Sequence, residues 1–373
     1  MEDDMRRHYV AATMLCVVAG TVHAQNVTLY GIVDGAITMA WPGYGSHVAF
    51  REDSGVSNGS RFGFLGNEDL GGGLHAKFQL ENGFASNTGV AQQGGAIFGR
   101  QAWVGLTSDR GWSVTLGRQY SPVDISLALS DAASQIFWGN TLVTGNGIYQ
   151  SPLATSGSAG LNSTARVNNS LLGSFSRGSF ELKVIGSTGD QNAARTGFLY
   201  GGSLTYSNDA VYLTAAFNRF RQYAADIPTG AAGAWQTEAT FGVVYRFGFG
   251  KVYAGYYFFN PSEENKNLTA TTFTSTNTYW IGIRIPVFVV DDLIAEVLRT
   301  RFNYADSHGS GTTIGITYAH YLSKKTTVYV TYGQVNNAAN AAAILWGGTA
   351  VVSYPGKPGA NPRAFSIGIR QLF

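Results

Sequence analysis

The sequence consists largely of short segments in which apolar and polar side chains alternate. In residues 74–81 the even positions hold Leu, Ala, Phe and Leu, whereas the odd positions hold His, Lys, Gln and Glu. A period of two places successive side chains on opposite faces of a β-strand. Such strands build either a soluble sandwich with a dry centre or a membrane barrel whose apolar face meets lipid and whose polar face encloses water.

Sixteen alternating segments follow one another from residue 27 to the end of the chain. Each is near the length that a tilted strand needs to cross a bilayer. The segments cover residues 27–40, 61–67, 74–81, 98–107, 112–119, 166–175, 179–187, 197–206, 210–220, 235–247, 251–259, 276–286, 293–302, 311–321, 326–335 and 363–373.

The connections between the segments favour the barrel. Tight turns alternate with long links, the latter at 41–60, 82–97, 120–165, 221–234, 260–275 and 336–362. A soluble sandwich has no reason to gather its short turns at one end, whereas outer-membrane barrels have short periplasmic turns and long external loops. Because lipid cannot hydrogen-bond an open sheet edge, the first strand must pair with the last. We therefore predict an all-β fold, a 16-stranded antiparallel transmembrane β-barrel.

The low charge agrees with a membrane protein, but not with a helical one. Charged residues make up 13% of the 373 residues, about half the usual share. No uncharged apolar run reaches the roughly 18 residues that a spanning helix needs. The longest stretch without a charged residue, 132–165, is rich in Gly, Ser, Thr and Asn.

The first 24 residues have the features of a secretory signal. Arg6 and Arg7 precede a mostly apolar segment at 9–20, and small residues lie at the cleavage positions before Gln25. We predict a signal peptide at 1–24, with Met1 or Met5 as the start, and a barrel domain at 25–373.

Other functional classes find little support. The only cysteine, Cys16, lies within the signal, so the mature chain has no disulfide and no Cys-ligated metal. The mature chain holds 23 basic and 20 acidic residues, a balance too even to indicate a nucleic-acid partner. No histidine pair has metal-ligand spacing and no Ser lies in a nucleophile elbow. We expect no enzyme activity, cofactor or metal; a barrel hydrolase and an adhesin or other soluble β structure are the alternatives from other classes.

Several motifs resemble the general (trimeric) porins of Gram-negative outer membranes, nearest to the beta-proteobacterial branch. They are VTLYGIVD at 27–34, SRFGF at 60–64, EDLGGGL at 68–74, GRQ at 117–119, YLSKKT at 321–326 and the terminal aromatic Phe373. The motifs lie at both ends of the mature chain, so the resemblance covers essentially all of it. The ending Gln-Leu-Phe departs from the basic ending that is usual in the family.

The resemblance implies an outer-membrane homotrimer surrounded by lipid and lipopolysaccharide, with a long third loop, residues 120–165, folded into the pore. It also implies that Arg61, Arg100 and Arg166 line the wall opposite this loop. Lys77 shares the polar face of its strand with His75 and Glu81, so its parity places it in the lumen as well.

Such a barrel would be an aqueous channel for passive diffusion of ions and small hydrophilic solutes. Low-dielectric walls focus the field of a few charges. The four basic residues of the wall, Arg61, Lys77, Arg100 and Arg166, outnumber the loop carboxylates Asp124 and Asp131. We therefore predict a weak preference for anions. The alternative is a channel selective for a small sugar, organic anion or phosphate.

Arg118 has the parity of the outward face, shared with Val114 and Leu116. An arginine in contact with lipid costs roughly 2–4 kcal/mol at mid-membrane. We therefore predict that Arg118 is covered by another subunit at its second loop. That loop, 82–97, holds no carboxylate, so a carbonyl or Glu81 would be the partner.

Overall fold

The computed structural model describes residues 26–45, 47–141, 165–189, 198–221, 235–260, 273–304, 307–352 and 357–373. The predicted signal peptide and residues 142–164 of the third loop lie outside these ranges. Among the described residues, no helix is both long and apolar enough to cross a membrane.

Within the described ranges, seventeen strands form one antiparallel sheet. Each of the predicted segments is a strand in the structure, with ends that differ by a few residues. In chain order the strands are β1 (Asn26–Trp41), β2 (Ala49–Ser54), β3 (Arg61–Gly71), β4 (Leu74–Gly83), β5 (Gln101–Ser108), β6 (Trp112–Tyr120), β7 (Arg166–Arg177), β8 (Phe180–Thr188), β9 (Phe198–Ser207), β10 (Val211–Arg221), β11 (Trp235–Phe247), β12 (Gly250–Asn260), β13 (Phe273–Val287), β14 (Asp291–Tyr304), β15 (His308–Tyr321), β16 (Thr326–Asn337) and β19 (Arg363–Leu372).

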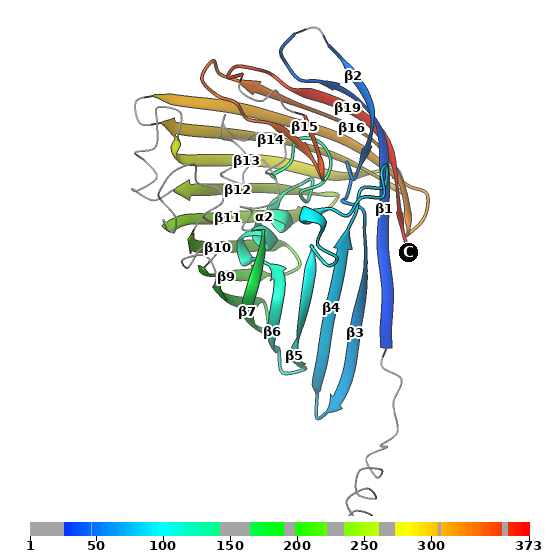
Figure 1. Ribbon diagram of the computed structural model, residues 1–373, viewed down its shortest axis with the longest axis vertical. Coiled ribbons are helices and arrows are strands. Elements are labelled where there is room, and N and C mark those ends of the chain that lie inside the picture. Colours follow the sequence, from blue (N-terminus) through cyan, green and yellow to red (C-terminus); the bar gives the residue numbers. More distant parts are fainter. Residues whose placement is uncertain are drawn as a thin grey trace, which may run out of the picture.

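Strand β1 closes the sheet into a barrel by pairing with β19, from Ile32 opposite Leu372 to Trp41 opposite Arg363 (Figure 1). Gly31 and Phe373 are joined by two further backbone hydrogen bonds of 3.2 and 3.1 Å. Closure gives the edges of the first and last strands hydrogen-bond partners that lipid cannot provide. The prediction of a closed barrel is confirmed.

The second strand of the barrel is interrupted, which is why the sheet has one strand more than predicted. β2 pairs with residues 35–40 of β1, and β3 pairs with residues 26–32 along the same edge. Between β2 and β3, residues 55–60 leave the sheet. Asp34 of β1 holds this break, because its carboxylate accepts a hydrogen bond from the backbone N–H of Ser57 at 3.1 Å. Together, β2 and β3 fill one of the 16 positions around the barrel.

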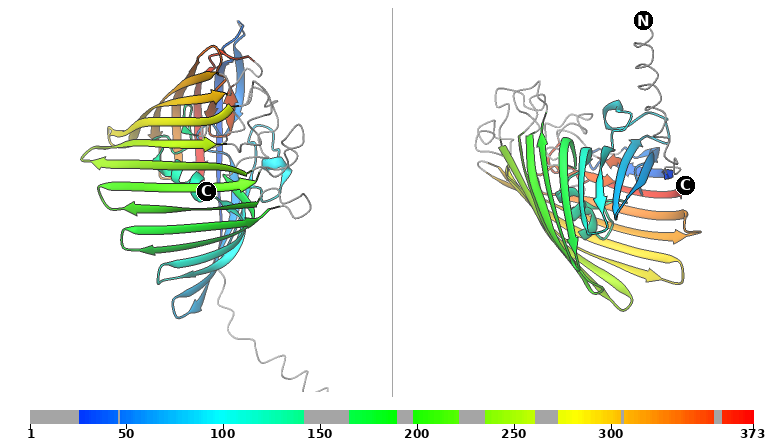
Figure 2. Two further views of the ribbon diagram at one scale, coloured as in Figure 1. Left: turned by 90° about the vertical axis from the view of Figure 1, so that its left-hand side faces the viewer. Right: turned by 90° about the horizontal axis from the view of Figure 1, so that it is seen from below.

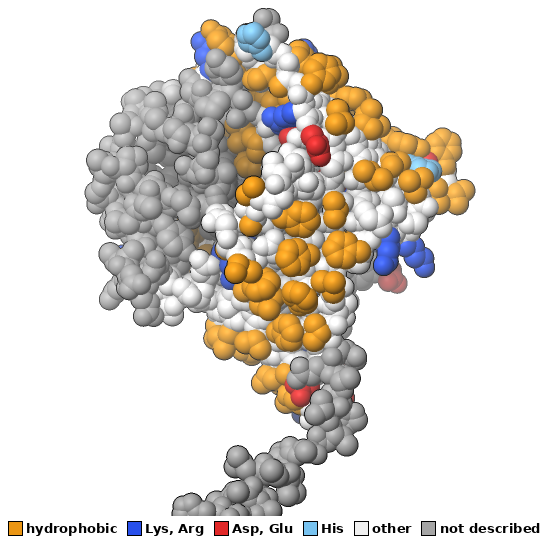
Figure 3. Space-filling model, turned by 45° about the vertical axis from the view of Figure 1, so that its right-hand side comes forward, with side chains coloured by type: hydrophobic (Ala, Val, Ile, Leu, Met, Phe, Trp, Pro, Cys, Tyr) orange, Lys and Arg blue, Asp and Glu red, His pale blue; other side chains and the backbone are white. Residues whose placement is uncertain are grey.

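The apolar side of the wall points outward. On β11, Phe241 is 50% exposed, whereas Gln236 and Glu238 on the other face are 2% and 1% exposed. Ile369 of β19 is 50% exposed as well. Figure 3 shows apolar side chains spread over the outer surface of the barrel. A soluble sandwich would bury these side chains, so the structure confirms the membrane-barrel interpretation of the alternation.

Short turns and long connections lie at opposite ends of the barrel, as the sequence predicts (Figure 2). The second long connection contains the short 3-10 helix η1 (Gln93–Gly95). The third contains the helix α2 (Pro122–Ser130), and the last contains a hairpin of β17 (Leu345–Gly347) and β18 (Ala350–Val352). The described parts of the third and last connections fold into the barrel, because Trp138 of the third bridges to Gly347 of the last and donates to Ser366 on the inner face of β19.

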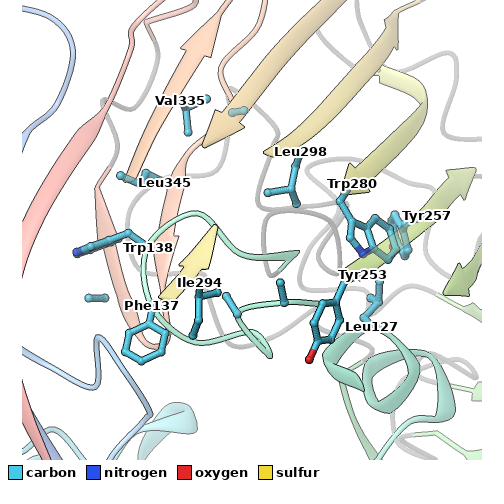
Figure 4. Close-up of a cluster of buried hydrophobic side chains, with 14 of the residues drawn as sticks. Leu127, Phe137, Trp138, Tyr253, Tyr257, Trp280, Ile294, Leu298, Val335 and Leu345 are labelled. Atoms are coloured by element: carbon cyan, nitrogen blue, oxygen red, sulfur yellow. The ribbon is translucent and has the colours of Figure 1, made fainter. Parts of the chain in front are cut away.

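The buried apolar cluster of the protein therefore lies between these loops and the inner wall (Figure 4). Trp138 is 1% exposed, and its indole Nε1 donates to Ser366 Oγ at 2.7 Å. Phe137 packs edge-on against Tyr329 of β16, with ring centroids 5.2 Å apart. The interior is thus partly packed, as expected for a third loop that folds into the pore, and the last loop adds to this packing.

Trp138→Ala is expected to loosen the third loop while the barrel stays closed. The change removes a fully buried ring, a loss of about 3–5 kcal/mol, but touches no strand pairing. Limited proteolysis should cleave the loop faster than in the wild type, with unchanged heat-modifiable mobility on gels. Trp112→Ala is the matched control, because Trp112 is 36% exposed on the outer surface. Equal cleavage of Trp138→Ala and wild type would contradict this role.

Candidate channel constriction

The three predicted wall arginines converge on one side of the lumen. Arg61 begins β3, Arg100 directly precedes β5, and Arg166 begins β7. The strands between them add Glu81 from β4 and Tyr120 from β6. Neighbouring strands lie roughly 4.8 Å apart, so long side chains on one face can meet. We call these five residues the arginine cluster.

Glu81 is the carboxylate at the centre of the arginine cluster. Its Oε1 accepts a hydrogen bond from Arg100 Nε at 2.7 Å and lies 3.8 Å from Arg61 Nη1. Its Oε2 accepts from the Tyr30 hydroxyl at 2.8 Å. Glu81 is 3% exposed and Arg100 is 6% exposed. Each of these buried charges therefore has a partner of opposite sign, which offsets the cost of removing it from water.

Tyr120 links Arg100 to Arg166, the third arginine of the cluster. Its hydroxyl accepts from Arg100 Nη2 at 2.7 Å and from Arg166 Nη2 at 3.1 Å. The guanidinium carbon of Arg166 also lies 4.8 Å from the centre of the Tyr120 ring, a cation–π contact. Arg61 is held separately by the carbonyl of Gly59 at 2.9 Å.

The arginine cluster contains three guanidinium groups and one carboxylate. The other hydrogen-bond acceptors named above are a hydroxyl and a carbonyl, both of them neutral. This part of the wall is therefore positively charged, and low-dielectric surroundings strengthen its attraction for anions.

Lys77 lies outside the arginine cluster. It is on β4 opposite Asn67 and Gly105, near the tight turn that joins β3 and β4. Gly83, the residue of β4 that pairs with Arg61, is six residues farther along the strand, roughly 20 Å away. Its parity with Glu81 keeps Lys77 on the lumen side, toward the end with the short turns.

The third loop starts with a well-capped helix fixed to the wall. Ser121 caps α2, and its Oγ accepts from the Asp124 N–H at 3.3 Å, with Pro122 in the first helical turn. The same Oγ accepts from Asn218 of β10 at 3.2 Å. Farther along, Ser126 and Thr214 share a hydrogen bond of 2.9 Å. These contacts hold α2 against the inner face of β10.

Asp124 is the loop carboxylate that is partly exposed. Burial raises its pKa to about 6, and the nearby Arg166 guanidinium opposes part of that rise. At neutral pH Asp124 is therefore mostly ionised and partly offsets the positive charge of the arginine cluster. Protonation in mildly acidic solution removes this negative charge.

Asp131, the other predicted loop carboxylate, is fully buried. Its oxygens accept hydrogen bonds from the backbone N–H groups of Ala133 at 2.7 Å, Gln135 at 3.1 Å and Thr141 at 2.7 Å. Asp131 thus shapes the loop from inside, and the structure does not place it among the charges that face solvent.

Glycines on the inner face let the loop approach the wall closely. A Cβ at Gly282 of β13 would lie 2.6 Å from the Cβ of Ala132, and one at Gly315 of β15 would lie 2.3 Å from the Trp138 carbonyl oxygen. Since such separations are impossible for real side chains, both positions need Gly. No sequence pattern marks these two glycines, because only the packed loop makes a side chain impossible there.

The last-loop hairpin is a further part of the constriction that sequence reasoning missed. Gly139 N–H of the third loop donates to Trp346 O at 3.0 Å, and Thr349 N–H donates to Gly55 O at 2.8 Å. Arg51 Nη2 of β2 donates to Val351 O at 2.8 Å. The run Leu-Trp-Gly-Gly-Thr-Ala-Val-Val contains a hairpin signal, two short apolar runs around Gly, but it is too short to stand out.

Arg118 lies near the end of β6 and forms hydrogen bonds within its own chain. Its Nε donates to the Gly99 carbonyl at 2.7 Å, and its Nη1 donates to Asn168. Gly99 follows the chain's own second loop. Glu81, one of the partners considered from the sequence, faces the lumen and is bound by Arg100, so it is not the partner of Arg118.

Together, a closed barrel with an apolar exterior, inward-folded loops and a charged inner wall defines a membrane channel. The chain matches the Gram-negative porin family over residues 11–340 and belongs to that family. It is an outer-membrane porin, a channel for passive diffusion and not an enzyme.

Two curated relatives are similar in sequence. An outer membrane porin protein of Bordetella pertussis is 41% identical over 134 residues, which is 31% of this chain and 34% of that protein. Outer membrane porin protein 32 of Delftia acidovorans is 27% identical over 381 aligned positions, covering 99% of this chain and all of the relative.

Two solved structures are similar in fold. The anion-selective porin from Comamonas acidovorans has a TM-score of 0.76 and 23% identity, with 94% of this chain and 100% of that chain covered. An outer-membrane protein of Vibrio cholerae in its trimer form has a TM-score of 0.67 and 16% identity, with 94% and 100% covered.

The charge of Asp124 is expected to make ion preference depend on pH. With a pKa of about 6, the carboxylate is charged above this pH and neutral below it, so the ratio of chloride to potassium permeability should rise as pH falls from 7.5 to 5. Reversal potentials in a KCl gradient measure this ratio. Asp124→Asn should show the higher ratio at both pH values. A pH response that persists in Asp124→Asn would assign it to another group.

Proposed function

We propose that this porin prefers anions weakly, and that it functions as a homotrimer in an outer leaflet of lipopolysaccharide. The arginine cluster supports the anion preference most directly, because it opposes three guanidinium groups with one carboxylate. Asp131 adds no solvent-facing negative charge, and Asp124 adds only one. Lys77 contributes a further positive charge nearer the end with the short turns.

The similarity to a porin named anion-selective is consistent with this proposal. At 23% identity that likeness concerns the fold alone, so the proposed ion preference rests on this chain's own charges. We expect the preference to be weak, because dissolved salt in an aqueous channel screens the wall charges within about 8–10 Å at physiological ionic strength.

Arg166→Gln should lower the chloride-to-potassium permeability ratio. A unit charge at contact distance in water is worth about 1 kcal/mol, so the change should be at most about fivefold. Glu81→Gln should shift the ratio in the opposite direction, and Lys324→Gln, in the β15–β16 turn, should leave it nearly unchanged. Clear potassium selectivity of the wild type would refute the proposal. Saturable conductance with one sugar, organic anion or phosphate would favour the substrate-selective alternative.

The homotrimer is supported by the trimer form of a structural neighbour. In this chain, Arg118 lies beside Leu116 and Leu171, which are 57% and 48% exposed. Its bond to Gly99 holds the guanidinium at the end of the second loop, where a neighbouring subunit would cover it and the two leucines.

Arg118→Leu should lower the temperature at which the trimer dissociates, because it removes hydrogen bonds at this edge. Semi-native gel electrophoresis after stepwise heating measures that temperature. Arg177→Leu, at the far end of β7, is the control for losing a surface arginine. An unchanged dissociation temperature in Arg118→Leu would rule out the proposed contact.

A further inference from the structure

Two arginines lie on the lipid-facing side of the barrel near the end of β10. Arg219 and Arg221 have the parity of Phe217, which is 47% exposed, whereas the alternate residues Asn218 and Phe220 are buried against the interior. Arg219 is exposed. Both residues lie at the end of the strand that enters a long connection, so they belong to the external half of the barrel.

Aromatic residues mark the membrane interface at this level. The guanidinium carbons of Arg219 and Arg221 lie 5.6 and 5.3 Å from the centre of the Trp235 ring. Trp235 in turn packs edge-on against Phe198 and Tyr200 of β9, at 5.8 and 5.7 Å. Girdles of Trp and Tyr lie at the headgroup level of barrel proteins. The two arginines therefore lie where lipid headgroups begin.

Neither arginine has an anionic partner among the described residues. The cross-strand neighbours of Arg219 are Tyr200 and Thr237, and Arg221 is opposite Trp235. The Nε of Arg221 is buried without a hydrogen-bond partner. By contrast, the outward Arg299 of β14 donates to Thr312 and Ser310.

The spacing of the two guanidinium groups suits a phosphate group. Residues i and i+2 of a strand are roughly 7 Å apart on one face, and stacking on one ring holds both side chains in place. Guanidinium groups bind phosphate through paired, charge-assisted hydrogen bonds. An isolated pair of cations would repel each other, and a bound anion removes that cost.

We propose that Arg219 and Arg221, stacked on Trp235, form a binding site for a phosphate on the headgroup of an outer-leaflet glycolipid. The inference rests on the proposed lipopolysaccharide surroundings and names the place where this chain contacts them. Two phosphate-binding arginines at the external rim would fix the barrel's height relative to the outer leaflet.

The test is a titration of the refolded full-length mature protein in detergent with bis-phosphorylated lipid A. The double variant Arg219→Gln/Arg221→Gln should raise the Kd for this lipid by about tenfold or more. Each lost hydrogen bond to a charged phosphate contributes more binding free energy than a hydrogen bond between neutral groups. The Kd of Arg219→Lys/Arg221→Lys should lie between those of the wild type and the glutamine variant, since the positive charges remain but the planar guanidinium groups are lost. Lys324→Gln/Lys325→Gln removes two charges from a turn at the other end and should bind as the wild type does.

Two further arms identify the ligand. Dephosphorylated lipid A should bind wild type and Arg219→Gln/Arg221→Gln equally, and inorganic phosphate at the same concentration should not displace the lipid. Equal Kd values for bis-phosphorylated lipid A in wild type and double variant would overturn the site, and full displacement by inorganic phosphate would overturn a lipid ligand. Conductance and ion preference of the double variant should match the wild type, so failure of this site is distinguishable from failure of the channel proposal.

Discussion

Backbone hydrogen bonding in a medium without water is the constraint on which this structure depends. A strand edge exposed to hydrocarbon leaves its N–H and C=O groups unsatisfied, at a cost of several kcal/mol per group. Pairing of β1 with β19 over ten residue pairs satisfies both edges. Once the sheet is closed, every strand has one lipid side and one lumen side, and the alternation of side chains follows from this.

The break in the second barrel strand gives the interior its organisation. Residues 55–60 leave the sheet, so backbone groups that a continuous strand would pair with its neighbours can bind other segments. Val56 O accepts from Phe137 N–H of the third loop at 2.9 Å, and Gly55 O accepts from Thr349 N–H of the last loop at 2.8 Å. The carbonyl of Gly59 binds Arg61. One short excursion thus connects both inward loops to the arginine cluster.

Charge and apolar packing occupy different parts of the lumen. The arginine cluster belongs to β3 through β7, whereas α2 packs against β8 to β12 and the segment around Trp138 packs against β15, β16 and β19. At the contact between α2 and the wall, the indole of Trp280 donates a hydrogen bond to the Ser130 carbonyl at 2.8 Å. The arginine cluster and the described parts of the inward loops thus lie against different strands, and this asymmetry supports the proposed preference for anions.

The sequence by itself determined the class of fold, because a side-chain period of two and alternating connection lengths are local features that a closed sheet makes necessary. The resemblance of its motifs to the porin family also indicated Arg61, Arg100 and Arg166 as residues of the wall. Only the tertiary structure decided which charges meet water. In the sequence, Asp131 and Asp124 are equivalent, since both are carboxylates of the third loop. In the folded loop, however, backbone N–H groups enclose Asp131. The break at 55–60, the last-loop hairpin and the need for Gly at 282 and 315 likewise depend on segments far apart in the chain, so no local pattern could reveal them.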